Sequence, residues 1–222
     1  MKTFRFITAC VAVGLIANAA QAGVSVNLGG GWQASFADET LVSVVVDSIG
    51  SDYIAIEISK DFTQPPNEAG IFPGIDITFT QVAGDAVTVP NIVILDESVT
   101  NLTGTDWTDY HMNLLSDGIA WFDVADSAGF SMLPFAFSSF SDPGNVFGDP
   151  NKATALDAVG GVVFNNASFF PGAGNGELVI SVDLASGKDG ASFVLEQIPT
   201  PEPATLALLA MGGLLLRRRR TA

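Results

Sequence analysis

The chain is poor in the residues from which most enzyme sites are built. Its 222 residues include one cysteine, Cys10, and one histidine, His111, and no arginine lies between residues 23 and 199. These absences exclude histidine-based zinc sites, Cys–His nucleophile pairs and arginine clamps on phosphate. No Gly-x-Ser-x-Gly segment accompanies His111, so a serine triad has no support. Carboxylate pairs remain, but 23 acidic residues make some pair inevitable. We therefore expect no enzymatic activity.

Positive charge is also scarce in the body of the chain. Between residues 23 and 199, three lysines (Lys60, Lys152 and Lys188) face 23 acidic residues, an excess of 20 negative charges. Such a body repels nucleic acid and anionic lipid headgroups, because it has few cations to replace phosphate counterions. We expect no nucleic-acid partner.

The N-terminus has the pattern of a secretory signal peptide. A short cationic start containing Lys2 and Arg5 is followed by an apolar run over residues 6–17 and by the small-residue pattern Ala20-Gln21-Ala22. This pattern predicts a signal helix over residues 1–22 that is cleaved before Gly23. The apolar run continues past Cys10, which argues against a lipoprotein anchor. The only cysteine then leaves with the signal, and the mature protein has no disulfide.

The C-terminus combines a stiff spacer with a short apolar segment. Alternate prolines over residues 198–203 exclude a helix and favour extended backbone. Residues 204–216 carry no charge and predict a helix of about 20 Å, shorter than the hydrocarbon core of about 30 Å. By the positive-inside rule, the terminal arginines would stay cytoplasmic and the body would lie outside. We thus predict three parts, with a body over residues 23–197 and a tail over residues 198–222.

This tail resembles the PEP-CTERM sorting signal of exported bacterial proteins. The resemblance covers about 24 residues and joins three elements in order: Pro201-Glu202-Pro203, the apolar helix, and the cluster Arg217, Arg218, Arg219 and Arg220. It implies that a membrane-embedded exosortase recognises the tail, cleaves near the motif and releases or transfers the body to the cell surface or extracellular matrix. Family members usually occur in bacteria that make exopolysaccharide. Tails in the family are often somewhat longer than this one.

The body has the pattern of many short strands. Alternating or β-branched runs, separated by turn residues such as Ser116-Asp117-Gly118, occur about a dozen times, and only residues 152–158 suggest a turn of helix. The spacing favours an all-β fold, an antiparallel β-sandwich of jelly-roll or Ig-like type. The runs cover residues 24–28, 32–36, 42–47, 53–58, 75–79, 86–95, 108–115, 119–124, 130–140, 158–164, 178–184 and 192–197.

A second local resemblance lies at residues 99–112, where a Trp-Thr-Asp-Tyr-His strand is similar to one often seen in PEP-CTERM sandwich proteins. The segment supports membership but carries no known activity. Strict alternation would place Trp107, Asp109 and His111 on one face and Tyr110 on the other. Asp109 and His111 are either part of a metal or acid–base site or a hydrogen-bonded pair on a partly exposed face. The second interpretation is favoured, because no other histidine or cysteine completes a metal shell.

Two binding hypotheses remain. Asp142, Asn145 and Asp149 form an oxygen-rich loop of the kind that Ca²⁺ prefers, although their spacing is not that of an EF-hand and solvated turns explain the same residues. We expect no other cofactor.

Trp32, Trp107 and Trp121 are either a platform for sugar rings or core residues, and core placement is favoured.

From the composition and the two ends of the chain, we predict a non-enzymatic exported protein of the cell surface or extracellular matrix, transiently anchored in the inner membrane by its C-terminal helix. Its expected partners are the exosortase and exopolysaccharide. The alternative function is a carbohydrate-binding β-sandwich module.

Overall fold

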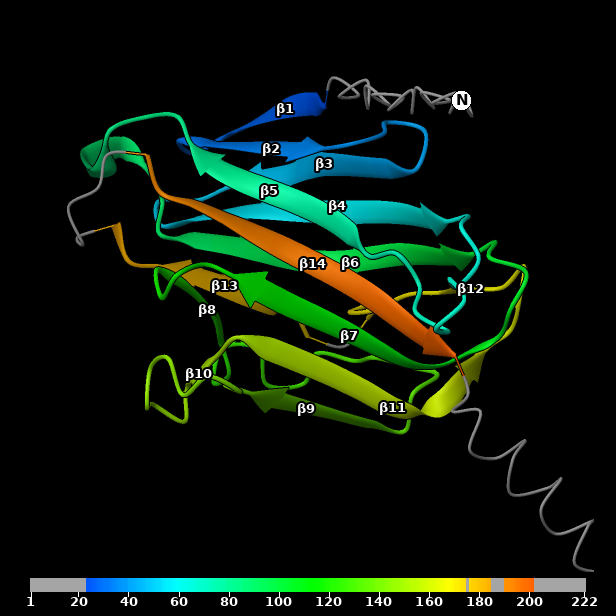
Figure 1. Cartoon of the computed structure of the whole chain (residues 1–222). Coiled ribbons are helices and arrows are strands. Elements are labelled where there is room, and N and C mark those ends of the chain that lie inside the picture. Colours follow the sequence, from blue (N-terminus) through cyan, green and yellow to red (C-terminus); the bar gives the residue numbers. More distant parts are fainter. Residues whose placement is uncertain (1–22, 175, 185–189, 202–222) are drawn as a thin grey trace, which may run out of the picture.

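The computed structural model describes residues 23–174, 176–184 and 190–201. The regular structure in these ranges is strand, apart from the 3-10 turn η1 (Asp85–Val87) and a 3-10 residue at Leu184. The strands form two sheets whose inner side chains make one apolar core, an arrangement consistent with a β-sandwich (Figure 1). The expected signal helix and C-terminal helix lie outside the described residues. Among those residues, none forms a helix with the length and hydrophobicity needed to cross a membrane.

The first sheet contains seven antiparallel strands. Their spatial order is β1 (Val24–Gly29), β2 (Trp32–Phe36), β5 (Ile75–Gln81), β14 (Ser192–Pro201), β7 (Trp107–Leu115), β11 (Ala155–Val163) and β9 (Phe137–Ser141). The last strand of the described residues, β14, is thus central and pairs on both sides (Figure 1).

The second sheet is mixed. Its order is β10 (Lys152–Ala153), β8 (Ala120–Asp123), β13 (Leu178–Val182), β6 (Asn91–Asn101), β4 (Tyr53–Phe62) and β3 (Val42–Ile49), with β12 (Ser168–Phe169) also pairing with β6. We expected antiparallel pairing throughout, but β4 and β6 are parallel. The chain leaves β4, crosses to the other sheet as β5 and returns as β6, so it re-enters this sheet in the original direction.

Period-two patterning explains which side chains fill the core. In β2, Trp32, Ala34 and Phe36 are buried while the residues between them are partly exposed. Apolar side chains from both sheets meet in this way, and the layer between the sheets excludes water.

Two expectations about element boundaries are wrong. Residues 152–158 form β10 and the start of β11 instead of a helical turn, because both segments find strand partners in the sheets. The body also continues past residue 197, since β14 runs to Pro201 and pairs with β7 to its end. Pro199 and Pro201 are tolerated there because β5 pairs with β14 only as far as Gln197, which leaves that side of the later residues unpaired.

Candidate functional site

The oxygen-rich loop uses its acidic side chains to hold its own backbone. Asp142 accepts hydrogen bonds from the amide of Phe147 (3.0 Å) and the hydroxyl of Thr154 (3.3 Å), and Asp149 accepts one from the amide of Asn151 (2.9 Å). The hydrogen bond from the Phe147 amide is the main cause that lowers the pKa of Asp142. In the described part of the chain, no group of three or more His, Cys, Asp or Glu side chains is placed to hold a metal ion. The geometry is that of turns.

The three tryptophans lie in different environments. Trp32 and Trp107 are 0% exposed, so neither offers a ring face to a sugar. Trp32 donates its indole N–H to the carbonyl of Val89 (2.8 Å). Trp121 is half-buried, and the ammonium of Lys152 lies over its ring at 3.7 Å from the centroid. The structure therefore places two of the three rings in the core, and the third is covered by a cation.

His111 pairs with a residue that the sequence did not suggest. Its Nδ1 lies 2.7 Å from the carboxylate of Asp157, which faces it across the β7–β11 ladder. The hydroxyl of Thr200 on β14 contacts Asp109 at 3.5 Å. The face assignment of Trp107 is also wrong, because a register shift at the start of β7 turns this ring to the same buried side as Tyr110.

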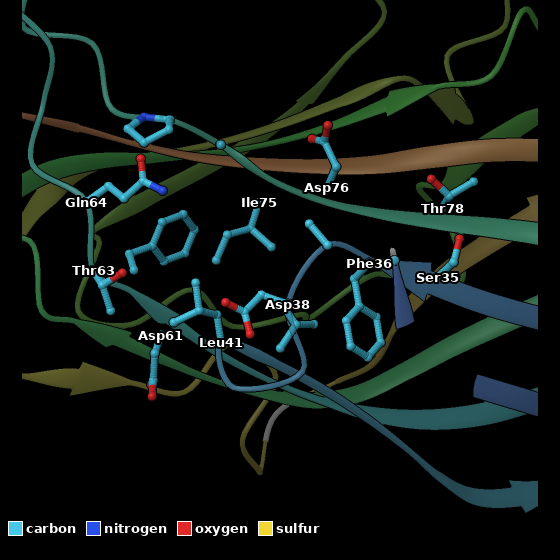
Figure 2. A pocket seen from close by; sticks show the side chains of 16 residues that line it. Ser35, Phe36, Asp38, Leu41, Asp61, Thr63, Gln64, Ile75, Asp76 and Thr78 are labelled. Atoms are coloured by element: carbon cyan, nitrogen blue, oxygen red, sulfur yellow. The ribbon is translucent and has the colours of Figure 1, made fainter. Parts of the chain in front are cut away.

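A surface pocket of about 420 Å³ opens where the two sheets meet beside β2 and β4 (Figure 2). It lies between the end of β2, the β2–β3 loop, the residues that follow β4 and the start of β5. Its polar lining side chains include Asp38, Asp61, Gln64 and Asp76, while Ile75 is among its apolar ones. This combination of acceptors, an amide and an apolar patch suits a ligand with many hydroxyl groups.

The three carboxylates of this pocket differ in environment. Burial, followed by the charge of Glu196 directly across the β5–β14 ladder, raises the pKa of Asp76. Asp38 is held by the hydroxyl of Thr40 (2.7 Å) and its amide (2.8 Å), and these hydrogen bonds lower its pKa. Asp38 is thus committed to its own turn, and Asp61 and Asp76 are the other two carboxylates of the lining.

A second constellation lies in the middle of the sandwich. The side chains of Lys60 and Glu97 are 0% exposed, and their charged atoms lie 3.0 Å apart. Gln197 and Tyr110, also 0% exposed, complete the cluster from the opposite sheet. We call these four residues the buried polar cluster. Lysine and glutamate are almost never fully buried, so this pair is the least ordinary feature of the core.

Hydrogen bonds connect the buried polar cluster. Lys60 Nζ contacts Glu97 Oε1 and donates to Gln197 Oε1. Gln197 Nε2 donates to Glu97 Oε1 at 2.9 Å, and the Tyr110 hydroxyl donates to Gln197 Oε1. Glu97 Oε2 is buried and has no hydrogen-bond partner among the described residues. An amine, a carboxyl group, a carboxamide and a phenol therefore form one connected group that solvent does not reach.

Burial dominates the protonation of this cluster. It lowers the pKa of Lys60, against the opposing effect of Glu97, and it raises the pKa of Tyr110 well above its usual value. Both shifts favour the uncharged forms, a neutral amine and a protonated phenol. Tyr110 is enclosed by the rings of Phe62, Trp107, Phe135 and Phe169, which keep water away from it.

Sequence reasoning missed the buried polar cluster, although part of its signal was present. In β4, Ile54, Ile56, Ile58, Lys60 and Phe62 alternate without a break, and all five are buried. The same alternation occurs in β14, where Phe193, Leu195 and Gln197 are buried. The sequence signal was a lysine or glutamine at a position where the alternation of a strand predicts a buried apolar side chain.

The residues predicted for signal cleavage and sorting lie at or beyond the edges of the described chain. Gly23 is exposed and directly precedes β1, and Pro201 is the last residue of β14. Ala20, Ala22, Glu202, Pro203 and the four terminal arginines lie outside the described residues. No protein-family model, curated protein or solved structure matches the chain.

Proposed function

We propose that this chain is a non-enzymatic structural protein, exported across the inner membrane, sorted by an exosortase and displayed on the cell surface or in the extracellular matrix. The proposal starts from the sequence of the two ends, a signal-peptide pattern before Gly23 and the ordered PEP-CTERM elements from Pro201 to Arg220. The exported body would be the two-sheet domain.

One structural observation supports the sorting step most directly. Strand β14 ends at Pro201, the first residue of the Pro-Glu-Pro motif. All the described strands of both sheets lie at or before Pro201, so cleavage after this residue would leave each of them whole. The end of β14 is also held in place, because Thr200 and Pro201 pair with Asp109 and Trp107 of β7.

For the fold, we propose a jelly-roll-like sandwich over an Ig-like one. From β4 to β12 every successive strand lies in the opposite sheet from the one before it. Repeated crossing between two sheets is expected when a long hairpin is rolled up, whereas an Ig-type domain keeps more neighbouring strands in one sheet. The parallel β4–β6 pair is a departure from the regular jelly-roll.

Intact-mass analysis of protein recovered from the surface of exosortase-competent cells tests the proposal. We expect a chain that begins at Gly23 and lacks Arg217, Arg218, Arg219 and Arg220. Replacing Pro201, Glu202 and Pro203 together with alanine should leave the tail attached, because exosortase recognition would read that motif. Alanine at Pro65 and Pro66, in the exposed segment after β4, is the matched control and should not change processing. Wild-type protein that keeps all four arginines on the surface would contradict the proposal.

A carbohydrate-binding module is the second candidate, and the pocket beside β2 and β4 is the observation in its favour. Glycan-array binding of the protein, with and without calcium, separates the two functions. The structural proposal predicts no glycan binding that depends on the side chains of this pocket. Specific binding that Asp61→Ala and Gln64→Ala abolish, while Asp126→Ala on the β8 side leaves it intact, would favour the binding module instead.

A further inference from the structure

The buried polar cluster brings together the groups needed to make an amide bond. Lys60 on β4 supplies an amine, and Gln197 on β14 supplies a carboxamide whose oxygen the amine contacts. Glu97 on β6 touches both nitrogens through one oxygen, at 3.0 Å from Lys60 Nζ and 2.9 Å from Gln197 Nε2. A single carboxyl group is therefore positioned between the atom that would attack and the atom that would leave.

A simple buried ion pair accounts poorly for this arrangement. Burying both charges is costly for each ion, and the cost is recovered only when the remaining polar atoms are satisfied. Glu97 Oε2 is not satisfied among the described residues. Transfer of the proton from the lysine to the glutamate removes both charges and leaves a neutral amine beside a carboxylic acid. The lowered pKa of Lys60 acts in the same direction.

We propose that Lys60 and Gln197 join in an intramolecular isopeptide bond, with Glu97 relaying the protons and Tyr110 stabilising the charge that develops on the amide oxygen. The bond would form in any compartment in which the domain folds, so it does not depend on the proposed export.

The chemistry balances without a cofactor or an oxidant. The lone pair of Lys60 Nζ attacks Gln197 Cδ, and negative charge develops on Oε1, toward which the Tyr110 hydroxyl already donates. The Glu97 carboxylic acid gives its proton to Nε2 and takes one from Nζ. The bond between Cδ and Nε2 then breaks and ammonia leaves. One carbon–nitrogen bond has replaced another, and Glu97 ends in the form in which it began.

The site also has the surroundings that this reaction requires. The side chains of Lys60 and Glu97 are 0% exposed and aromatic rings surround Tyr110, so solvent is kept from the reacting groups and hydrolysis does not compete. The strands hold the reacting groups in contact, which replaces a bimolecular encounter by an intramolecular one. The bond would tie one sheet to the other in a body that contains no cysteine.

Mass spectrometry of the full-chain protein, unfolded before measurement, tests the proposal. We expect the wild type to weigh less than its sequence by one ammonia. Lys60→Arg keeps a cation opposite Glu97 but cannot supply a neutral amine, so it should have its full sequence mass. Glu97→Gln should also keep the ammonia. Lys152→Arg, which alters a lysine over the Trp121 ring, is the matched control and should show the same deficit as the wild type.

Tryptic mapping locates the bond. The body contains three lysines and no arginine, so trypsin separates Lys60 from Gln197 in an unlinked chain. In the linked chain, Lys60 is acylated and resists cleavage, and one species unites the segment ending at Lys152 with the segment that follows Lys188. A wild type with full sequence mass and complete cleavage after Lys60 would overturn the proposal, as would a deficit that persists in Lys60→Arg.

Discussion

Replacing Lys60 and Glu97 together by apolar side chains gives opposite results for a covalent link and for an ion pair. In a protein held by an ordinary buried ion pair, the double variant Lys60→Met/Glu97→Leu should be as stable as the wild type or about 1–4 kcal/mol more stable, because two desolvated charges are removed. Lys60→Met alone should cost about 3–5 kcal/mol, since it leaves Glu97 buried without its partner. The double variant is therefore the informative one.

A covalent link reverses the sign of that result. Lys60 and Gln197 are 137 residues apart, and closing a loop of this length removes chain entropy worth about 5 kcal/mol from the unfolded state. In the double variant, loss of the link lowers the free energy of unfolding, and removal of the buried Glu97 offsets part of that loss. The net decrease should be about 1–5 kcal/mol.

Urea unfolding followed by tryptophan fluorescence measures the difference. The unlinked chain also exposes more surface when it unfolds, so the m-value of the double variant should exceed that of the wild type. A double variant that is equally or more stable, with an unchanged m-value, would refute the reasoning.

Four further predictions concern single side chains. Trp107→Ala should cost about 3–5 kcal/mol in urea unfolding because the ring is fully enclosed, whereas the half-buried Trp121→Ala should cost less; equal losses would contradict the core assignment. Calcium should raise the melting temperature no more than monovalent salt does at the same ionic strength, and a calcium-specific increase that Asp149→Asn removes would show a real site in that loop. The raised pKa of Asp76 means that the folded state binds its proton more tightly, so stability falls as pH rises above 3.8 through the folded pKa, and Asp76→Asn should flatten that decline in pH-dependent unfolding. The lowered pKa of Asp142 has the opposite sign, so its contribution is complete above 3.8 and is lost as pH falls through the folded pKa, a loss that Asp142→Asn should abolish.

The sequence predicted most strands because alternation and turn residues are local signals. It predicted the extents of β4 and β14 poorly. Both errors concealed members of the buried polar cluster, Lys60 and Gln197. The run of alternating isoleucines in β4 continues through Lys60 to Phe62, but a charged residue normally ends an apolar pattern. Gln197 lies on the buried phase of β14, at a position that the sequence assigned to the end of the domain.

The alternation of the sequence does not predict which face of β6 carries Glu97. The β4–β6 register steps from Ile94 to Asp96 and passes over Leu95, so Ile94 and Glu97 both point into the core although they are three residues apart. A similar shift turns Trp107 inward in β7. Such bulges depend on the partner strand, and the meeting of Lys60 with Gln197 depends on how the two sheets stack. The buried polar cluster therefore depends on strand pairing and sheet packing, which local sequence patterns do not predict.

The central position of β14 has a mechanical consequence for a body held by its C-terminal end. A tensile load entering through Pro201 acts along the axis of a strand that is hydrogen-bonded to β5 on one side and β7 on the other (Figure 1). Such a load shears both ladders at once, whereas a load on an edge strand such as β1 would peel its hydrogen bonds one after another. Under the proposed display at the cell surface, a tether through this strand would distribute the force over both neighbouring strands.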